Sequence, residues 1–272
     1  MSNPRYIRRF GKIDRVQHLV LLVCFLGLAA TGLPLLFSHA RWAPVLAQAF
    51  GGFQVTGVVH RVLAIVLIGV FFSHVTRLFR RLMAGERSLL WGPSSLVPQP
   101  KDAVDLYRHV LWFLRRGPKP AFDRYTYWEK FDYWAVFWGM VVIGGSGLML
   151  WFPHFFSRRI PGWIFNVALL VHGEEALLAV GFIVTIHFFN SHMRPSKFPM
   201  DTVMFTGVVE EREYAHERPL EVERLKASGS FEARLAPAPH PRFLARARVF
   251  GFIAIGVGLS LLLLILVAIF TR

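Results

Sequence analysis

Long apolar stretches alternate with short polar and basic segments along this chain. Four stretches, at about residues 16–37, 56–79, 132–152 and 167–190, each hold roughly the 20 apolar residues that an α-helix needs to cross a bilayer. A fifth stretch, at about 248–270, is apolar after Arg248 at its start, apart from one serine. The pattern predicts an all-α protein, an integral membrane helical bundle with a four-helix core. The fifth helix is expected to face lipid or a partner chain.

The same boundaries give the expected organisation of the chain. Residues 1–193 hold the four-helix core, 194–247 form a polar cytoplasmic segment, and 248–272 contain the fifth transmembrane helix. The polar segment mixes acidic and basic residues with several prolines, which predicts a peripheral and partly irregular region. Between the second and third helices, KDAVDLYRHVLWFLRR has apolar residues at helical spacing and basic residues on the other side. It is expected to lie on the membrane surface, with His109 at the interface.

Two of the predicted helices carry a pair of histidines. In the fourth, His172 and His187 are fifteen residues apart, so at about 100° per residue they return to within roughly 60° of each other, about 22 Å apart along the axis. In the second, His60 and His74 are fourteen residues apart, again on nearly one face and about 21 Å apart. His18 enters the membrane with the first turn of the first helix. The spacing indicates two layers of histidines.

The charge pattern predicts the topology. The sequence is 54% hydrophobic, and its net charge of +14 comes from basic residues that crowd the ends of the apolar stretches. Such residues determine topology and contact membrane lipid, so they do not indicate nucleic-acid binding. Counting them places the N-terminus on the cytoplasmic side of a bacterial inner membrane and the C-terminus on the periplasmic side. His60 and His172 then lie near the periplasm, and His18, His74 and His187 near the cytoplasm.

The cysteine count limits the cofactors. The single cysteine, Cys24, lies inside the first apolar stretch. One cysteine excludes, in this chain, an internal disulfide, a CxxCH site for covalent haem and the cysteine set of an iron–sulfur cluster. Any such cluster would belong to another chain.

Two histidine layers favour haem over other ligands. Imidazole is an axial ligand of haem iron, and two imidazoles from different helices can hold one haem between them. Two layers about 20 Å apart therefore suit two non-covalent haems. One alternative is a zinc or nickel transporter, whose site needs three or more converging ligands. The other is an anchor whose histidines only form hydrogen bonds.

Three parts of the sequence resemble a known family. They are GKIDRVQHLVLLVCFLGLAATGLPLLF in the first helix, VVHR at the start of the second, and the paired histidines of the fourth. Together they look like the di-haem cytochrome b subunit of membrane-bound formate dehydrogenase. The related hydrogenase cytochromes b and bacterial cytochrome b561 proteins share the arrangement. The resemblance covers about residues 5–215, so the fifth helix lies outside it.

The resemblance implies two b haems with defined ligands. His60 and His172 would ligate the haem near the periplasm, and His18 and His187 the one near the cytoplasm. Helical periodicity alone favours His74 as the partner of His187, whereas the resemblance favours His18. In the second case His74 would hydrogen-bond a haem propionate or a quinone oxygen, or carry a proton near neutral pH.

The resemblance also implies a site for menaquinone or ubiquinone, where the segment before the third helix meets the second haem. That segment reads RYTYWEKFDYW. Thr126 takes the place of a family asparagine and Glu129 that of a glutamine, so the quinone contacts differ in detail. These two residues, Lys130 and His74 are the candidates for quinone contact.

The expected function is electron transfer. The chain would be the cytochrome b subunit of a respiratory redox complex and carry electrons between a periplasmic partner and the quinone pool. The partner would be a dehydrogenase, the iron–sulfur subunit of a hydrogenase or a multihaem cytochrome c, and it would hold the catalytic residues. The alternatives are a transmembrane electron carrier without quinone turnover and, in another class, a metal-ion transporter.

Overall fold

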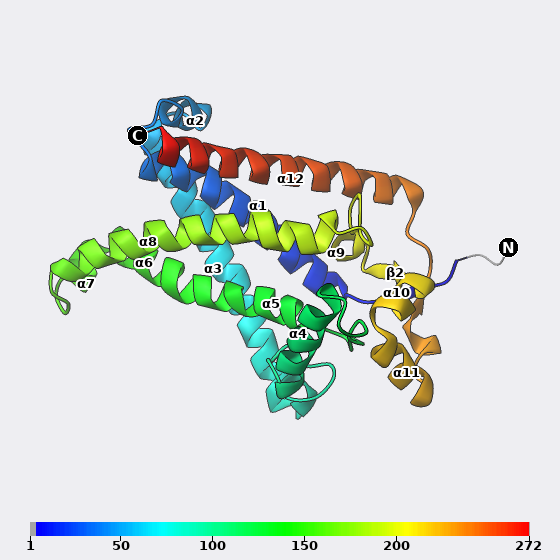
Figure 1. Cartoon of the computed structure of the whole chain (residues 1–272). Coiled ribbons are helices and arrows are strands. Elements are labelled where there is room, and N and C mark those ends of the chain that lie inside the picture. Colours follow the sequence, from blue (N-terminus) through cyan, green and yellow to red (C-terminus); the bar gives the residue numbers. More distant parts are fainter. Residues whose placement is uncertain (1–3, 272) are drawn as a thin grey trace. The chain divides into compact units, whose positions relative to one another are not determined.

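The protein is predominantly helical, as Figure 1 shows for the computed structural model, which describes residues 4–271. Five helices are long and apolar enough to cross a membrane, which confirms the predicted helical membrane protein. They span Lys12–Leu36, Phe53–Met83, Tyr127–Trp151, Trp163–Met193 and Pro241–Phe270.

The third and fourth of these long helices contain π-helical turns. The third consists of α5 (Tyr127–Gly139), a π-turn (Met140–Gly144) and α6 (Gly145–Trp151). The fourth consists of α8 (Trp163–Phe182) and two π-turns, Ile183–His187 and Phe189–Met193. The other three long helices are α1 (Lys12–Leu36), α3 (Phe53–Met83) and α12 (Pro241–Phe270).

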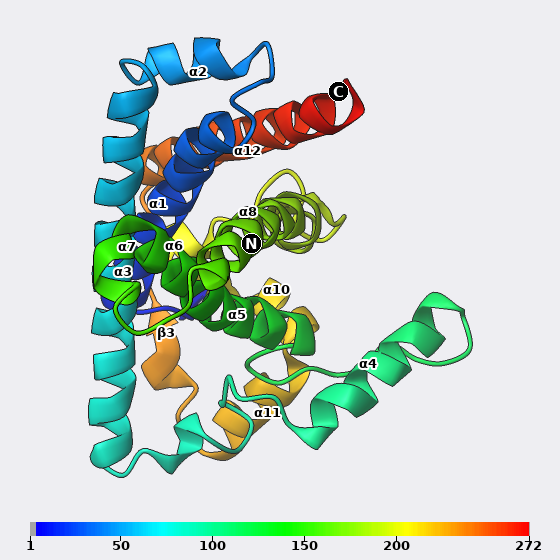
Figure 2. The same cartoon turned by 90° about the vertical axis from the view of Figure 1, so that its left-hand side faces the viewer.

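Shorter elements connect the long helices. The short helices are α2 (Ala43–Ala49), α4 (Pro100–Phe113), α7 (Pro153–Phe156), α9 (Val203–Thr206), α10 (Glu211–Glu217), α11 (Pro219–Ala227) and the 3-10 turns Arg87–Leu89 and Glu232–Arg234. The strands are β1 (Tyr6–Arg8), β2 (Val208–Glu210) and β3 (Leu235–Ala236). Figure 2 shows α2 after α1 and before α3.

The helix α12 begins upstream of the apolar stretch that starts at about residue 248. Its first residue is Pro241, a favoured first helical position because the missing N–H needs no partner there. The alanines and arginines that follow favour helix, so the two basic first turns continue into the apolar part. The prediction from hydrophobicity covered only the apolar part of the helix, so it did not include these first turns.

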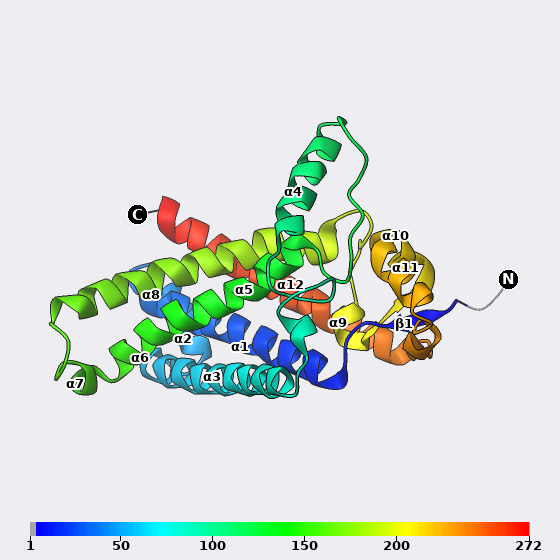
Figure 3. The ribbon, with the colours of Figure 1, turned by 90° about the horizontal axis from the view of Figure 1, so that it is seen from below.

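The chain divides into two compact units, and the first contains the strands. It comprises the N-terminal residues through Arg15, His74–Val136 and Thr202–Leu244. The sheet order is β2–β1–β3, with Ile7 opposite Val209 on one side and Leu235 on the other, both antiparallel. In Figure 3, α10 and α11 lie beside β1. The polar segment thus forms defined helices and strands around a small core: Ile7, Val203, Val209, Tyr214, Val222, Leu225 and Phe231.

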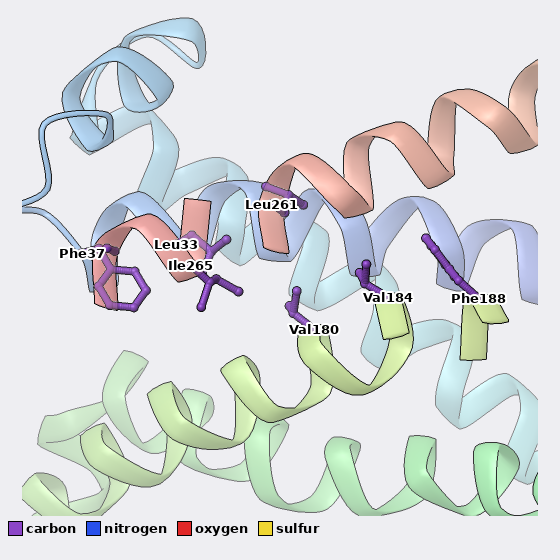
Figure 4. Packing of buried hydrophobic residues seen from close by; sticks show 8 residues of the cluster. Leu33, Phe37, Val180, Val184, Phe188, Leu261 and Ile265 are labelled. Atoms are coloured by element: carbon purple, nitrogen blue, oxygen red, sulfur yellow. The ribbon is translucent and has the colours of Figure 1, made fainter. Parts of the chain in front are cut away.

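The second unit contains most of the apolar helical residues. It comprises Val16–Ser73, Phe137–Asp201 and the chain from Ala245 onward. Its core joins α1, the fourth long helix and α12, as Figure 4 shows. The core residues are Leu33, Phe37, Val180, Val184, Phe188, Leu261, Ile265 and Ala268.

One face of α12 packs closely on the fourth helix. A Cβ at Gly258 would lie 2.9 Å from Cε2 of Phe188, so only glycine permits this approach. Small residues give such close packing between membrane helices. The expectation that α12 only faces lipid or a partner is therefore too simple, because this face is buried within the chain, while Ile253 and Leu263 remain exposed.

Candidate functional site

His60 of α3 and His172 of α8 lie side by side. Their ring centroids are 6.3 Å apart, and the ring planes are inclined by 73°. Both side chains are half-buried. The structure therefore brings together the two histidines that the sequence places near the periplasm.

A threonine sets the orientation of the His60 ring. The Thr31 hydroxyl donates to the carbonyl oxygen of Gly27 at 2.7 Å and lies 3.0 Å from Nδ1 of His60. Because the hydroxyl hydrogen is used by Gly27, the Thr31 oxygen accepts from Nδ1–H. Thr31 is fully buried in α1, so this contact is fixed by packing. The lone pair of His60 then lies on Nε2.

A carbonyl group of the third helix sets the orientation of the His172 ring. Nδ1 of His172 lies 3.0 Å from the carbonyl oxygen of Ile143 and 3.3 Å from the Ser146 hydroxyl. A carbonyl oxygen can only accept, so Nδ1 carries the hydrogen. Ile143 belongs to the π-turn, a local widening that is common at functional sites. Both histidines therefore present Nε2, with its lone pair, to a ligand.

Glycines make room for both rings. A Cβ at Gly32 would lie 3.1 Å from Cε1 of His60, and a Cβ at Gly147 would lie 2.9 Å from Cε1 of His172. A side chain at Gly147 would force the ring to move. The glycines of the first and third helices thus allow each imidazole to lie against a neighbouring backbone.

The pair fits an iron held between two imidazoles. Rings bound to opposite sides of one metal, each through a nitrogen at about 2 Å, have centres roughly 6 Å apart. The observed 6.3 Å agrees with this requirement. Both Nδ1 atoms are hydrogen-bonded within the chain, so Nε2 is the atom of each ring that could ligate an iron.

A second group of histidines forms in the same unit. His18 lies close enough to His187 and His192 for electrostatic interaction with both. His187 ends the first π-turn of the fourth helix, and His192 lies in the second. The structure therefore brings together His18 and His187, as the layer model requires, and adds His192.

The π-turns explain why His192 is missed by helical periodicity. Five residues of regular α-helix would turn His192 about 140° away from His187. A π-turn adds one residue without adding rotation, which reduces the angle to about 40°. The same effect changes the angle between His172 and His187 from roughly 60° to about 40°. Nδ1 of His192 is buried and has no hydrogen-bond partner among the residues described.

His74 lies in the first unit, in a polar cluster of its own. Its Nε2 is 2.9 Å from the hydroxyl of Tyr133, and its Nδ1 is 3.5 Å from the guanidinium of Arg77. Arg77 also pairs with Asp14 at 2.6 Å. The sequence placed His74 among the quinone candidates but gave no sign of its tyrosine partner, which comes from the third helix.

Glu129 and Thr126 belong to a buried ion-pair cluster. Glu129 accepts from Arg9 at 2.8 Å and from Arg218 at 2.9 Å, and its other oxygen accepts from the hydroxyl and backbone N–H of Thr126. Arg9 and Arg218 are 7% and 3% exposed. Burial by itself lowers the pKa of Arg9, but the Glu129 carboxylate raises it above its ordinary value. For Arg218, burial outweighs the Glu129 carboxylate and lowers the pKa.

The cluster continues into the polar segment. Arg124 donates to Glu221 at 3.0 Å, and Glu221 also accepts from the buried Tyr214 hydroxyl. Burial raises the pKa of Tyr214. Residues of α10 and α11 are therefore bonded to the segment that precedes the third helix. Arg218 and Glu221 could not be assigned to it from the sequence, because such pairings join distant parts of the chain.

Lys130 and His109 also have structural partners. Lys130 donates to Asp102 at 2.8 Å, and Asp102 accepts from the backbone N–H of Gln99 at the start of α4. His109 is 8% exposed, with Nδ1 3.0 Å from the Tyr127 hydroxyl. Its ring lies among the aromatic rings of Trp112, Phe113, Phe122, Tyr127 and Trp128. His109 is thus buried within the unit, and its expected position at the membrane interface stays a prediction.

Comparison with known proteins gives one family and several relatives. The model of the family described as prokaryotic cytochrome b561 matches residues 9–193. The chain is 22% identical to the cytochrome b556(Fdn) subunit of the nitrate-inducible formate dehydrogenase of Escherichia coli K12, over 70% of this chain and 79% of the relative. It is 23% identical to the cytochrome b556(fdo) subunit of formate dehydrogenase from the same organism, over 70% and 80%. It is 25% identical to the formate dehydrogenase cytochrome b556 subunit of Haemophilus influenzae, over 69% and 72%.

Proposed function

Because this chain belongs to the prokaryotic cytochrome b561 family, we propose that it carries electrons through two b haems between a periplasmic partner and the quinone pool. The chain is a multi-pass membrane cytochrome b, and membership of the family implies haem b as its cofactor. Two haems, their ligands, the quinone and the direction of insertion belong to the proposal.

The observation that carries the proposal is the His60–His172 pair. Its ring separation of 6.3 Å and its two engaged Nδ1 atoms suit one iron with two axial imidazoles. A haem b bound there would supply a one-electron carrier. The residues of this chain hold both rings in one tautomer, exclude rotation through Thr31 and Ile143, and leave space at Gly32 and Gly147.

The second histidine group supports a second haem. We assign His18 and His187 as its ligands, because they lie together in the structure and match the positions implied by the family resemblance. His18 and His187 would hold the haem iron between them, and His192 would lie beside these two ligands. Its buried Nδ1 suits a hydrogen bond to a propionate.

The quinone is assigned to the cytoplasmic end of the protein. Thr126, Glu129 and Lys130 already bond within the chain, so they support the shape of this region more directly than they offer contacts to a ligand. His74, with its tyrosine partner, remains the candidate with proton-carrying chemistry. Menaquinone and ubiquinone both suit this assignment.

The partner is proposed to be a periplasmic dehydrogenase. The relatives are named as subunits of formate dehydrogenase, which favours this class over a hydrogenase iron–sulfur subunit or a multihaem cytochrome c. The metal-ion transporter has less support. Within residues 4–271, no group of three or more His, Cys, Asp or Glu side chains, the group of His18, His187 and His192 included, is placed so that it could hold a metal ion.

Haem counting tests the proposal. Pyridine haemochrome spectra of the purified protein, with protein quantification, should give two b haems per chain. His60→Ala and His172→Ala should each reduce the count to one and stop electron transfer from the periplasmic side, while the protein still inserts. A purified protein with zinc and no haem would contradict the proposal. Two haems retained in either variant would contradict the assigned ligands.

A further inference from the structure

A chain of polar groups in the first unit joins three membrane helices. The hydroxyl of Tyr133, from α5, lies 2.9 Å from Nε2 of His74, from α3. Nδ1 of His74 faces Arg77, one turn later in α3, and Arg77 is paired with Asp14 of α1 at 2.6 Å. The side chains of Arg77 and Asp14 are 27% and 39% exposed. This series of polar side chains therefore begins at the phenol of Tyr133 and ends at the partly exposed Arg77 and Asp14.

The hydrogen bonds among these polar side chains have a definite direction. A guanidinium can only donate, so the long 3.5 Å contact from Arg77 makes Nδ1 of His74 an acceptor. The hydrogen of neutral His74 then lies on Nε2 and is donated to the oxygen of Tyr133. The Tyr133 oxygen is then the acceptor in this hydrogen bond, so its own hydrogen points away from His74.

We infer that Tyr133 and His74 form the route by which a proton passes between water and the bound quinone. The inference rests on the proposed function, since it assigns residues to the quinone reaction proposed there. Imidazole suits the task because it can release a proton from one nitrogen while it takes up another at the second. Arg77 and Asp14, which are both partly exposed, lie on the Nδ1 side of the ring.

The reaction balances as follows for quinone reduction. A quinone takes up two electrons, one at a time from haem, and two protons, and each carbonyl oxygen becomes a hydroxyl. The O–H bond of Tyr133 breaks as the first quinone O–H bond forms, and the Tyr133 oxygen takes the Nε2 hydrogen of His74. Nδ1 of His74 exchanges its contact with Arg77 for a proton from water, and a turn of the ring then brings this hydrogen back to the side of Tyr133. The second quinone oxygen takes its proton from water directly, and oxidation of a quinol reverses each step.

The pair formed by Tyr127 and His109 provides a matched comparison in the same unit. It is also a tyrosine–histidine hydrogen bond, of 3.0 Å, at the start of α5. Its histidine is 8% exposed and surrounded by aromatic rings, whereas His74 lies beside the partly exposed pair of Arg77 and Asp14. It should therefore carry no protons to the quinone.

Single-turnover reoxidation tests the route in the full-length protein with its haems, in nanodiscs. The haems are reduced with dithionite, excess reductant is removed, and reoxidation by decylubiquinone is followed by haem absorbance. Tyr133→Phe and His74→Gln should slow this reaction by about 100-fold, the usual contribution of one positioned proton donor. Tyr127→Phe and His109→Gln should react at the wild-type rate. Ferricyanide, which takes electrons without protons, should reoxidise all variants equally fast.

Two further readouts separate proton transfer from a structural role. Added imidazole should restore the rate of His74→Ala with decylubiquinone. Infrared difference spectra on quinone binding should show a shifted tyrosine C–O band that Tyr133→Phe loses and Tyr127→Phe keeps.

The outcomes that overturn the inference are distinct from those that overturn the proposed function. If the wild-type haems are reoxidised by decylubiquinone and Tyr133→Phe reacts equally fast, the route is wrong and the proposed function stands. Slow reoxidation of Tyr133→Phe by ferricyanide as well, or no rescue by imidazole, would assign these residues a structural role and also overturn the route. Wild-type haems that decylubiquinone does not reoxidise would overturn both.

Discussion

The Nδ1 atom of His172 lies 3.0 Å from the carbonyl oxygen of Ile143, which belongs to the π-turn of the third transmembrane helix. The third helix carries no histidine between residues 127 and 151, yet through this carbonyl it sets the tautomer of a histidine in the fourth. Its contribution to the proposed haem site is positional, and Gly147, one helical turn beyond Ile143, supplies the space for the ring.

Gly147→Ala should displace the His172 ring, because the new Cβ would lie 2.9 Å from Cε1. We expect loss of the periplasmic haem in most molecules, so that the haem count falls from two toward one per chain. Gly145→Ala is the matched control, since a Cβ at Gly145 has nothing within 4 Å. Pyridine haemochrome spectra provide the measurement. Equal haem contents in the two variants would show that the ring has freedom to move.

His18→Ala should remove the cytoplasmic haem, whereas His74→Ala should retain both haems. The reason is that His18 lies with His187, while His74 is bonded to Tyr133. His192→Ala should also retain both haems, with a shifted midpoint potential of one. Haem counting and potentiometric titration distinguish these results. The opposite pattern, with haem lost only in His74→Ala, would exchange the roles of His18 and His74.

Glu129→Gln should destabilise the first unit. Glu129 pairs with Arg9 and Arg218, and its loss leaves two buried guanidinium groups without a counter-charge. Removing one partner of a buried ion pair typically costs about 3 kcal/mol or more of unfolding free energy. Glu86→Gln is the control, because the Arg81–Glu86 pair is 45% and 44% exposed and its loss should cost below about 1 kcal/mol. Chemical denaturation in detergent, followed by tryptophan fluorescence, compares the two. Equal midpoints would contradict this role of Glu129.

Tyr214 should make the protein less stable at alkaline pH. The phenol is buried and donates to Glu221, and burial raises its pKa above the ordinary value of 10.0. The folded state therefore keeps this proton more tightly than the unfolded state. The stabilisation is complete below the ordinary pKa and is lost as the pH rises toward the higher pKa of the folded protein. The melting temperature should fall more steeply with increasing pH for the wild type than for Tyr214→Phe. Tyr107→Phe, at a position 64% exposed, should follow the wild type.

The transmembrane helices and most of the histidine arrangement could be predicted from the sequence, because both depend on local patterns along the chain. Runs of apolar residues predicted five long helices, and spacing placed His60 with His172 in one layer. It failed at His192, since a π-turn changes the rotation between neighbouring residues and no pattern in FNSHM marks one.

Long-range polar pairing was the other feature beyond sequence reasoning. Arg218 and Glu221 read as charges of a peripheral segment, but burial against Glu129 and Arg124 makes them part of a packed unit. Likewise Tyr133 read as one aromatic residue among many, and its hydrogen bond to His74 depends on how α3 and α5 pack. Such pairings depend on how distant parts of the chain pack together, and a single sequence does not reveal that packing.

The position of β1 between β2 and β3 has a consequence for biosynthesis. The ribosome releases Tyr6–Arg8 long before it makes Val208–Glu210 and Leu235–Ala236, so β1 has no strand partners while the first four long helices enter the membrane. Its two edges pair only after both of these later segments have been made. A stalled or truncated nascent chain would therefore display an open β-edge, the kind of surface that chaperones and quality-control proteases can recognise.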